Sequence, residues 1–76
     1  MLKIEQQILI DIVKLMPKYG IDYCLFECEN PFVTSRTLYN WAGERTKPRP
    51  RKYSLVMSAL KTKYSDKYNK MICVIE

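Results

Sequence analysis

Apolar residues recur at helical spacing in four stretches of this chain, with proline or glycine between them. The first stretch carries its apolar stripe at Ile4, Ile8, Ile12, Leu15 and Met16. Charged residues lie off this stripe, and Pro17 and Gly20 follow it. An apolar stripe that repeats every three or four residues is typical of an amphipathic helix. The pattern therefore predicts a first helix over about residues 3–16.

The second stretch predicts a shorter helix over residues 21–29. Its apolar residues at helical spacing are Ile21, Leu25 and Cys28. Asn30 followed by Pro31 is a stop signal for a helix. A β-strand is the alternative for this stretch, because residues 23–26 also suit a sheet.

The third stretch has the pattern of a helix with one apolar and one polar face. Thr34 or Ser35 is a good N-terminal cap, and Val33 can pack just before it. Leu38 and Trp41 lie three residues apart and share the inner face. The outer face is polar and carries Ser35, Arg36, Tyr39 and Asn40. Because Gly43 suits the end of a helix, we expect this helix over residues 35–43.

The fourth stretch predicts a longer helix over residues 50–65, with Pro50 in its first turn. Its apolar stripe consists of Tyr53, Val56, Met57, Leu60 and Tyr64. This stripe should pack against the first helix and cover Trp41. The sequence thus predicts one mainly α domain of about four helices spanning residues 1–76.

The C-terminal run MICVIE is rich in β-branched residues and predicts a short β-strand over residues 70–75. A single strand is unstable alone. It can pair with the same segment of a second subunit, or it can pack on its own domain. In the first case the protein is a homodimer and the dimer contacts are Met71, Ile72, Cys73, Val74 and Ile75.

Charge is unevenly distributed along the chain. The formal net charge is +5, and residues 36–52 hold six basic residues against one acidic residue, while the remainder holds seven of each. Such a concentration favours a polyanionic partner, whose affinity rises as phosphates are neutralised. The alternatives are a solvated basic loop, an anionic membrane surface or an acidic protein.

Several classes of chemistry lack the residues they need. The chain has no histidine, no glycine-rich phosphate loop and only scattered carboxylates, so we expect neither an enzyme nor a cofactor. Three cysteines without histidine do not favour a metal site. We expect Cys24 and Cys28 to be buried apolar residues of a reduced protein rather than a redox switch. The chain has no targeting signal and no apolar run long enough to cross a bilayer, so a cytoplasmic location is expected.

The segment VTSRTLYNW resembles the turn and recognition helix of helix-turn-helix regulators of the Cro and phage-repressor type. Val33 matches the apolar turn position, and Leu38 and Trp41 match the buried pair of the recognition helix. Glu27 and Pro31 depart from the family pattern, which has apolar residues there. Together with KPRPR, the segment also resembles MerR-like and excisionase proteins. Both resemblances imply binding to double-stranded DNA.

The resemblance implies that the outer face of the third helix reads base edges, through Ser35, Arg36, Tyr39 and Asn40. The basic stretch that follows would contact phosphates or a minor groove as an extended arm, or else be an ordinary loop between two helices. The residues expected at phosphates are Thr34, Arg45, Thr46, Lys47, Arg49, Arg51 and Lys52. The expected function is transcriptional regulation, most simply repression, by a phage or mobile-element protein. The alternatives are a recombination directionality factor, a protein-interaction module such as an antirepressor or host-factor inhibitor, and RNA binding.

Overall fold

The protein is mainly helical, as the sequence predicts. The computed structural model describes residues 2–75. Its elements are α1 (Lys3–Leu15), a 3-10 turn η1 (Pro17–Tyr19), α2 (Tyr23–Glu29), α3 (Ser35–Ala42), α4 (Pro50–Lys63) and α5 (Ser65–Ile75). The four predicted helices are confirmed, and their ends differ from the prediction by one or two residues. The alternative of a strand over residues 23–26 is wrong, because this segment is helical.

The predicted C-terminal strand over residues 70–75 is also wrong, because this segment is the end of helix α5. No strand occurs among residues 2–75. Tyr68, Met71 and Ile75 recur at helical spacing, and this face packs on the core. Met71 is fully buried, and α5 packs against both α1 and α4. Burial of that face outweighs the β preference of the branched side chains, which depends strongly on context.

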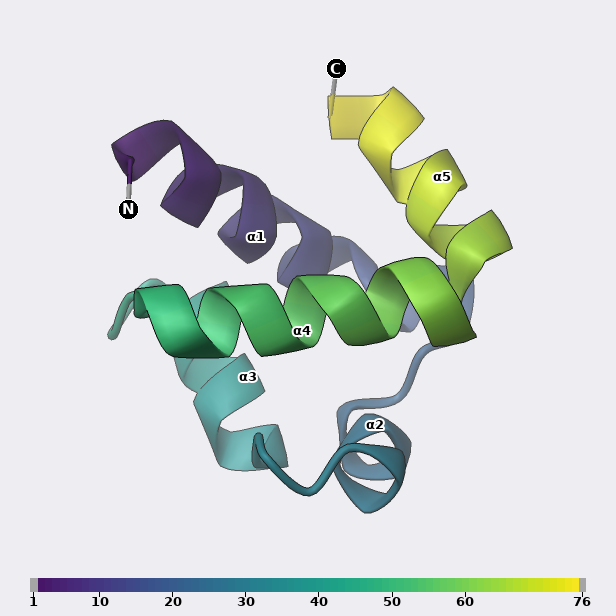
Figure 1. Ribbon diagram of the computed structural model, residues 1–76, viewed down its shortest axis with the longest axis horizontal. Coiled ribbons are helices and arrows are strands. Elements are labelled where there is room, and N and C mark those ends of the chain that lie inside the picture. The colour runs from purple at the N-terminus through teal and green to yellow at the C-terminus, as the bar shows by residue number, and fades with distance from the viewer. Residues whose placement is uncertain (1, 76) are drawn as a thin grey trace.

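Helix α1 is the centre of the packing arrangement, since it contacts α3, α4 and α5. In Figure 1, α4 crosses the front of the molecule, α2 and α3 lie below it, and α1 and α5 rise above it. Residues from all five α-helices meet in one core. Its fully buried members include Leu9, Ile12, Phe26, Leu38, Leu60 and Met71.

The expected apolar faces are confirmed for α3 and α4. Val33, Leu38 and Trp41 are buried as predicted, and so are Val56 and Leu60. The expected cap is also present, because the side chain of Thr34 accepts a 3.1 Å hydrogen bond from the backbone N–H of Thr37. Local signals were sufficient here because cap, apolar pair and helix end lie within a few residues of one another.

The predicted apolar faces of α1 and α2 are only partly right. Ile4 leaves 66 % of its surface exposed, and α1 buries Leu9, Ile10 and Val13 beside the expected Ile12. In α2 the buried residues are Tyr23 and Phe26, whereas Leu25 is 54 % exposed. The expected burial of Cys24 and Cys28 is wrong, and all three cysteines, Cys24, Cys28 and Cys73, are exposed. A helix as short as α2 buries only the side that faces the rest of the domain, and its sequence alone does not say which side that is.

The connection between α2 and α3, residues 30–34, is tied to α4. The side chain of Asn30 is buried, donates to the carbonyl of Phe26 at 3.0 Å and accepts from the Lys63 ammonium at 3.0 Å. Lys52 of α4 donates to the carbonyl of Phe32. These contacts give hydrogen-bond partners to the Asn30 amide and to two backbone carbonyls. They hold the segment that leads into α3 against α4.

No helix among residues 2–75 combines the length and the apolar character that a membrane span requires.

Candidate nucleic-acid interface

The outer face of α3 carries the side chains that the sequence assigned to base reading. Arg36, Tyr39, Asn40 and Gly43 follow one another at helical spacing on this face. Arg36 and Tyr39 are exposed, and Asn40 is half-buried. Leu38 and Trp41 on the opposite face are almost inaccessible to solvent. Burial of that pair therefore holds the polar face of α3 outward.

Tyr39 is held in place by another aromatic ring. Its ring packs edge-on against Tyr23 of α2, with the ring centroids 4.7 Å apart and the planes at 85°. The hydroxyl of Tyr23 donates a 2.5 Å hydrogen bond to the carbonyl of Val13 in α1. Tyr39 is still 56 % exposed. It therefore presents an anchored ring at the surface rather than a freely rotating one.

The start of α3 is occupied by an acidic side chain that the sequence did not assign to the site. The carboxylate of Glu27 accepts a 2.5 Å hydrogen bond from the backbone N–H of Ser35. Ser35 is half-buried, and the hydroxyl of Thr34 already caps the helix. Thr34 was expected at phosphates and Ser35 at base edges, yet the hydroxyl of Thr34 and the backbone N–H of Ser35 both take part in internal hydrogen bonds at the N-terminus of α3.

The end of α3 directs the chain into the basic segment. The N–H of Glu44 donates to the carbonyl of Trp41 at 3.0 Å, and the N–H of Arg45 donates to that of Asn40 at 2.9 Å. This pair of hydrogen bonds is the Schellman arrangement, which places one residue in the left-handed conformation. That residue is Glu44, with φ of 56°, and not the neighbouring Gly43.

Gly43 lies beside the side chain of Arg45. A Cβ atom added to Gly43 would lie 3.4 Å from Nη1 of Arg45. The Arg45 guanidinium therefore folds back over the end of α3. This places a cation directly beside the outer face of that helix, at the point where the basic segment begins.

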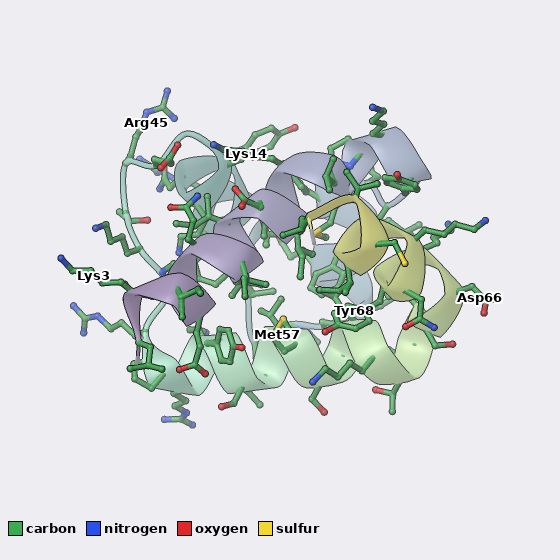
Figure 2. All side chains as sticks on the ribbon, turned by 90° about the horizontal axis from the view of Figure 1, so that it is seen from above. Lys3, Lys14, Arg45, Met57, Asp66 and Tyr68 are labelled. Carbon is green, nitrogen blue, oxygen red and sulfur yellow. The ribbon has the colours of Figure 1, made fainter. Side chains whose placement is uncertain are left out.

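The basic segment between α3 and α4, residues 43–49, lies along α1. At one end the Lys14 ammonium is 2.8 Å from the Glu44 carboxylate. At the other end the Gln6 amide donates a 3.0 Å hydrogen bond to the carbonyl of Pro48, which is buried. Figure 2 shows Lys3, Lys14 and Arg45 on the same side of the molecule. We call residues 43–49 the basic connection.

The basic connection differs from the extended arm that the sequence suggested. It joins two helices and is fixed to α1 near both ends, while Pro50 already begins α4. Arg51 and Lys52 belong to the first turn of α4. Two fixed ends leave little freedom for the segment between them, so its cations are presented by an ordered backbone.

Most residues expected at phosphates are accessible, and one has an internal partner. Those exposed to solvent are Thr34, Arg45, Thr46, Lys47, Arg49 and Arg51. Lys52 is half-buried, and its ammonium donates to the carbonyl of Phe32. Lys52 therefore joins α4 to the α2–α3 connection and is the least suited of the set to a phosphate.

The single acid of the basic connection is compensated within the fold. The hydrogen bond from Lys14 and its charge lower the pKa of Glu44. The nearby charge of Lys47 lowers this pKa further. The same hydrogen bond raises the pKa of Lys14. Both groups are thus charged at neutral pH and offset each other. Arg45, Lys47 and Arg49 keep the surface of the basic connection positive.

The residues expected at a dimer contact have different environments. Met71 is fully buried in its own core, Ile72 and Ile75 are half-buried, and Cys73 and Val74 are exposed. The prediction that two subunits pair through this segment as β-strands is wrong, because the segment is helical. Homodimerisation itself stays a prediction.

Among residues 2–75, no group of three His, Cys, Asp or Glu side chains is placed to hold a metal ion.

Sequence reasoning missed Lys3, Gln6, Lys14 and Glu27, which all contribute to this region. Lys3, Gln6 and Lys14 lie off the apolar stripe of α1, so the sequence identifies them as surface residues. It does not reveal that the basic connection packs beside them. Glu27 was noted only as a departure from the helix-turn-helix pattern. Its distance of eight residues from Ser35 left no local signal for the contact.

Comparisons with protein-family models, with curated proteins and with solved structures gave no match for this chain.

Proposed function

We propose that this protein binds double-stranded DNA and reads its sequence with the outer face of α3. The observation that carries the proposal is the continuity of two surfaces. The exposed polar face of α3 leads without interruption, through Arg45 folded over Gly43, into the basic connection. Contacts that read bases and contacts that bind phosphates are different in kind, and a sequence-reading protein needs both.

The residue types on α3 suit a major groove. Arg36 offers the paired donors that match guanine, and Asn40 offers a donor and an acceptor that match adenine. Tyr39 and the side chain of Ser35 would contact bases beside them. The α2–α3 pair would be a helix-turn-helix unit, as the resemblance of VTSRTLYNW to phage repressors suggests.

The basic connection would lie on the phosphates next to that groove. Arg45, Lys47 and Arg49 are exposed on a backbone that is already ordered, so binding requires little further loss of chain freedom. We propose that the biological role is transcriptional regulation, most simply repression, in the cytoplasm and by a homodimer.

The test is a titration of labelled duplex DNA at several salt concentrations, after selection of bound fragments from random duplexes. Arg36→Ala and Asn40→Ala should relax the selected consensus, whereas Arg49→Ala should weaken binding to all sequences equally. Each lost phosphate contact makes the slope of log K against log salt shallower by about 0.9. Lys70→Ala is the matched control, because it removes an exposed lysine from α5. No binding at low salt, or an unchanged consensus in both α3 variants, contradicts the proposal.

A second candidate function rests on the exposed side of α2. Leu25 is 54 % exposed there, and Cys24 and Cys28 of the same helix are exposed as well. Residues 22–29 contain three acids and no basic residue, which is unfavourable beside DNA phosphates. Such a surface suits a protein partner, as in an antirepressor or a host-factor inhibitor. A retained partner protein that is lost with Leu25→Ser, together with no DNA shift at low salt, favours this candidate.

A further inference from the structure

The face of α1 that lies beside the basic connection forms a pocket with it. Lys3, Ile4, Gln6, Gln7 and Ile10 line this pocket from α1, and Lys47 lines it from the basic connection. Its volume is about 300 Å3. The pocket is open to solvent, and its lining includes two lysines from parts of the chain that are far apart in sequence.

The charged residues that line this pocket are both lysines. No carboxylate lines it. Glu5 lies on the other side of α1, where its charge contributes to the raised pKa of Tyr53 on α4. Asp11 accepts a 3.0 Å hydrogen bond from the amide of Gln7. Within residues 2–75, neither Lys3 nor Lys47 forms an ion pair.

The position of Lys47 is fixed by its neighbours rather than by its own side chain. Gln6 holds the carbonyl of Pro48, the residue that follows Lys47, and the ring of Pro48 is buried. Lys14 holds Glu44, three residues before Lys47. The backbone at Lys47 is therefore kept beside α1 from both directions. A lysine whose backbone is positioned before binding loses less entropy on contact with an anion.

We propose that this pocket takes a phosphate of the DNA backbone between Lys3 and Lys47, so that the DNA contact extends from the basic connection onto the N-terminal turns of α1. The inference rests on the proposed function. It adds Lys3 to the phosphate contacts and gives Gln6 a positioning role, since its amide keeps Lys47 in place. Free inorganic phosphate offers the same chemistry, and the test separates it from a phosphate of DNA.

The test compares Lys3→Ala with Lys70→Ala in DNA titrations at several salt concentrations. Both variants remove one exposed lysine, so the net charge is the same in each. Lys3→Ala should bind DNA several-fold more weakly at low salt, with a slope shallower by about 0.9 and an unchanged consensus. Lys70→Ala should have little effect. Equal effects of the two variants overturn the inference.

Two further measurements sharpen the result. Gln6→Leu keeps every charge, so loss of Lys47 positioning should weaken binding while the slope changes by less than in Lys3→Ala. Amide NMR shifts during a titration with inorganic phosphate, without DNA, report on the free anion. Saturation by inorganic phosphate at the Lys3 pocket, combined with normal DNA binding by Lys3→Ala, assigns the pocket to a small anion and overturns the DNA contact. If Arg49→Ala weakens DNA binding and Lys3→Ala does not, the inference about the pocket fails while the proposed function stands. If the unaltered protein does not bind DNA, both the inference and the proposed function fail.

Discussion

The carboxylate of Glu27 in α2 accepts a 2.5 Å hydrogen bond from the backbone N–H of Ser35, the first residue of α3. The N-terminus of a helix carries partial positive charge from its unpaired N–H groups. Glu27 satisfies one of these groups and places a negative charge beside them. The acid that departs from the helix-turn-helix pattern thus stabilises the start of α3 and holds α2 against it.

We expect Glu27→Gln to lower the free energy of unfolding by about 0.5 to 1 kcal/mol, because the charge at the helix start is lost. Ser35→Pro removes the N–H donor at a position where proline is compatible with the helix, and the extended backbone of Thr34 accepts a following proline. Urea unfolding of both single variants and the double variant forms a cycle that isolates the interaction between the Glu27 charge and the Ser35 N–H. Strictly additive effects would show that the charge contributes nothing through this contact.

Leu38→Ala should destabilise the domain by about 2 to 5 kcal/mol, because Leu38 is fully buried and truncation leaves a cavity. A domain of this size has little stability to spare. The control is Leu25→Ala, a chemically identical change at a residue that is 54 % exposed, for which we expect a change of at most about 0.5 kcal/mol. Thermal melts followed by circular dichroism give both values. Similar losses in the two variants would contradict the assigned faces of α2 and α3.

Glu44 adopts a left-handed conformation that disfavours any residue with a Cβ. We expect Glu44→Gly to be more stable than Glu44→Ala by about 1 kcal/mol. Both substitutions remove the same ion pair with Lys14, so their difference reports on the backbone alone. The measurement is urea unfolding of the two variants in parallel. A more stable alanine variant would show that residue 44 does not hold this conformation in solution.

Burial, followed by the hydrogen bond from its hydroxyl to Glu29, raises the pKa of Tyr64 to about 12 from its ordinary value of 10.0. The folded protein therefore holds this proton more tightly than the unfolded chain does. The resulting stability is fully present below about pH 10 and is lost as the pH rises through about 12. Stability measured by urea unfolding should thus fall over this window, and it should fall less steeply in Tyr64→Phe. Tyr23 and Tyr53, whose pKa values burial also raises, remain in that variant as an internal reference. Equal slopes in the two proteins would contradict the assignment to Tyr64.

How much of this structure the sequence predicts depends on how local each signal is. Thr34, Val33, Leu38 and Trp41 form a cap and an apolar face within nine residues, so the position and orientation of α3 follow from the sequence. The face that α2 buries does not follow from the local sequence. Phe26 packs against the ring of Tyr64, which is distant in sequence, with the ring centroids 5.8 Å apart. The sequence predicts a strand over residues 70–75 because the β preference of branched residues is a local signal. The surfaces of α1 and α4 on which α5 packs are not visible in that segment.

The same reasoning applies to the candidate site. The outer face of α3 was predictable as a spacing on one helix, and so was the density of cations after it. The attachment of the basic connection to α1 was not, since Gln6 and Pro48 are 42 residues apart in sequence. The local pattern around Pro48 does not distinguish a free arm from a segment that is hydrogen-bonded to a helix distant in sequence. The pocket beside Lys3 exists only because of that attachment.

Tyr39 offers the sharpest separation between stability and DNA reading, because its ring has one partner inside the protein and its surface is otherwise exposed. Tyr39→Ala removes the edge-on pair with Tyr23 and should cost about 0.5 to 1.5 kcal/mol of stability. Tyr39→Phe keeps the ring pair and should melt like the unaltered protein.

If the Tyr39 hydroxyl contacts a base, Tyr39→Phe relaxes the selected DNA consensus at one position while the melting temperature stays constant. If only the ring is used, the consensus of Tyr39→Phe is unchanged and that of Tyr39→Ala is altered. Fragment selection and thermal melts on the two variants decide between these results. An unchanged consensus in both variants would remove Tyr39 from the proposed reading face and leave it as the residue that fastens α3 to α2.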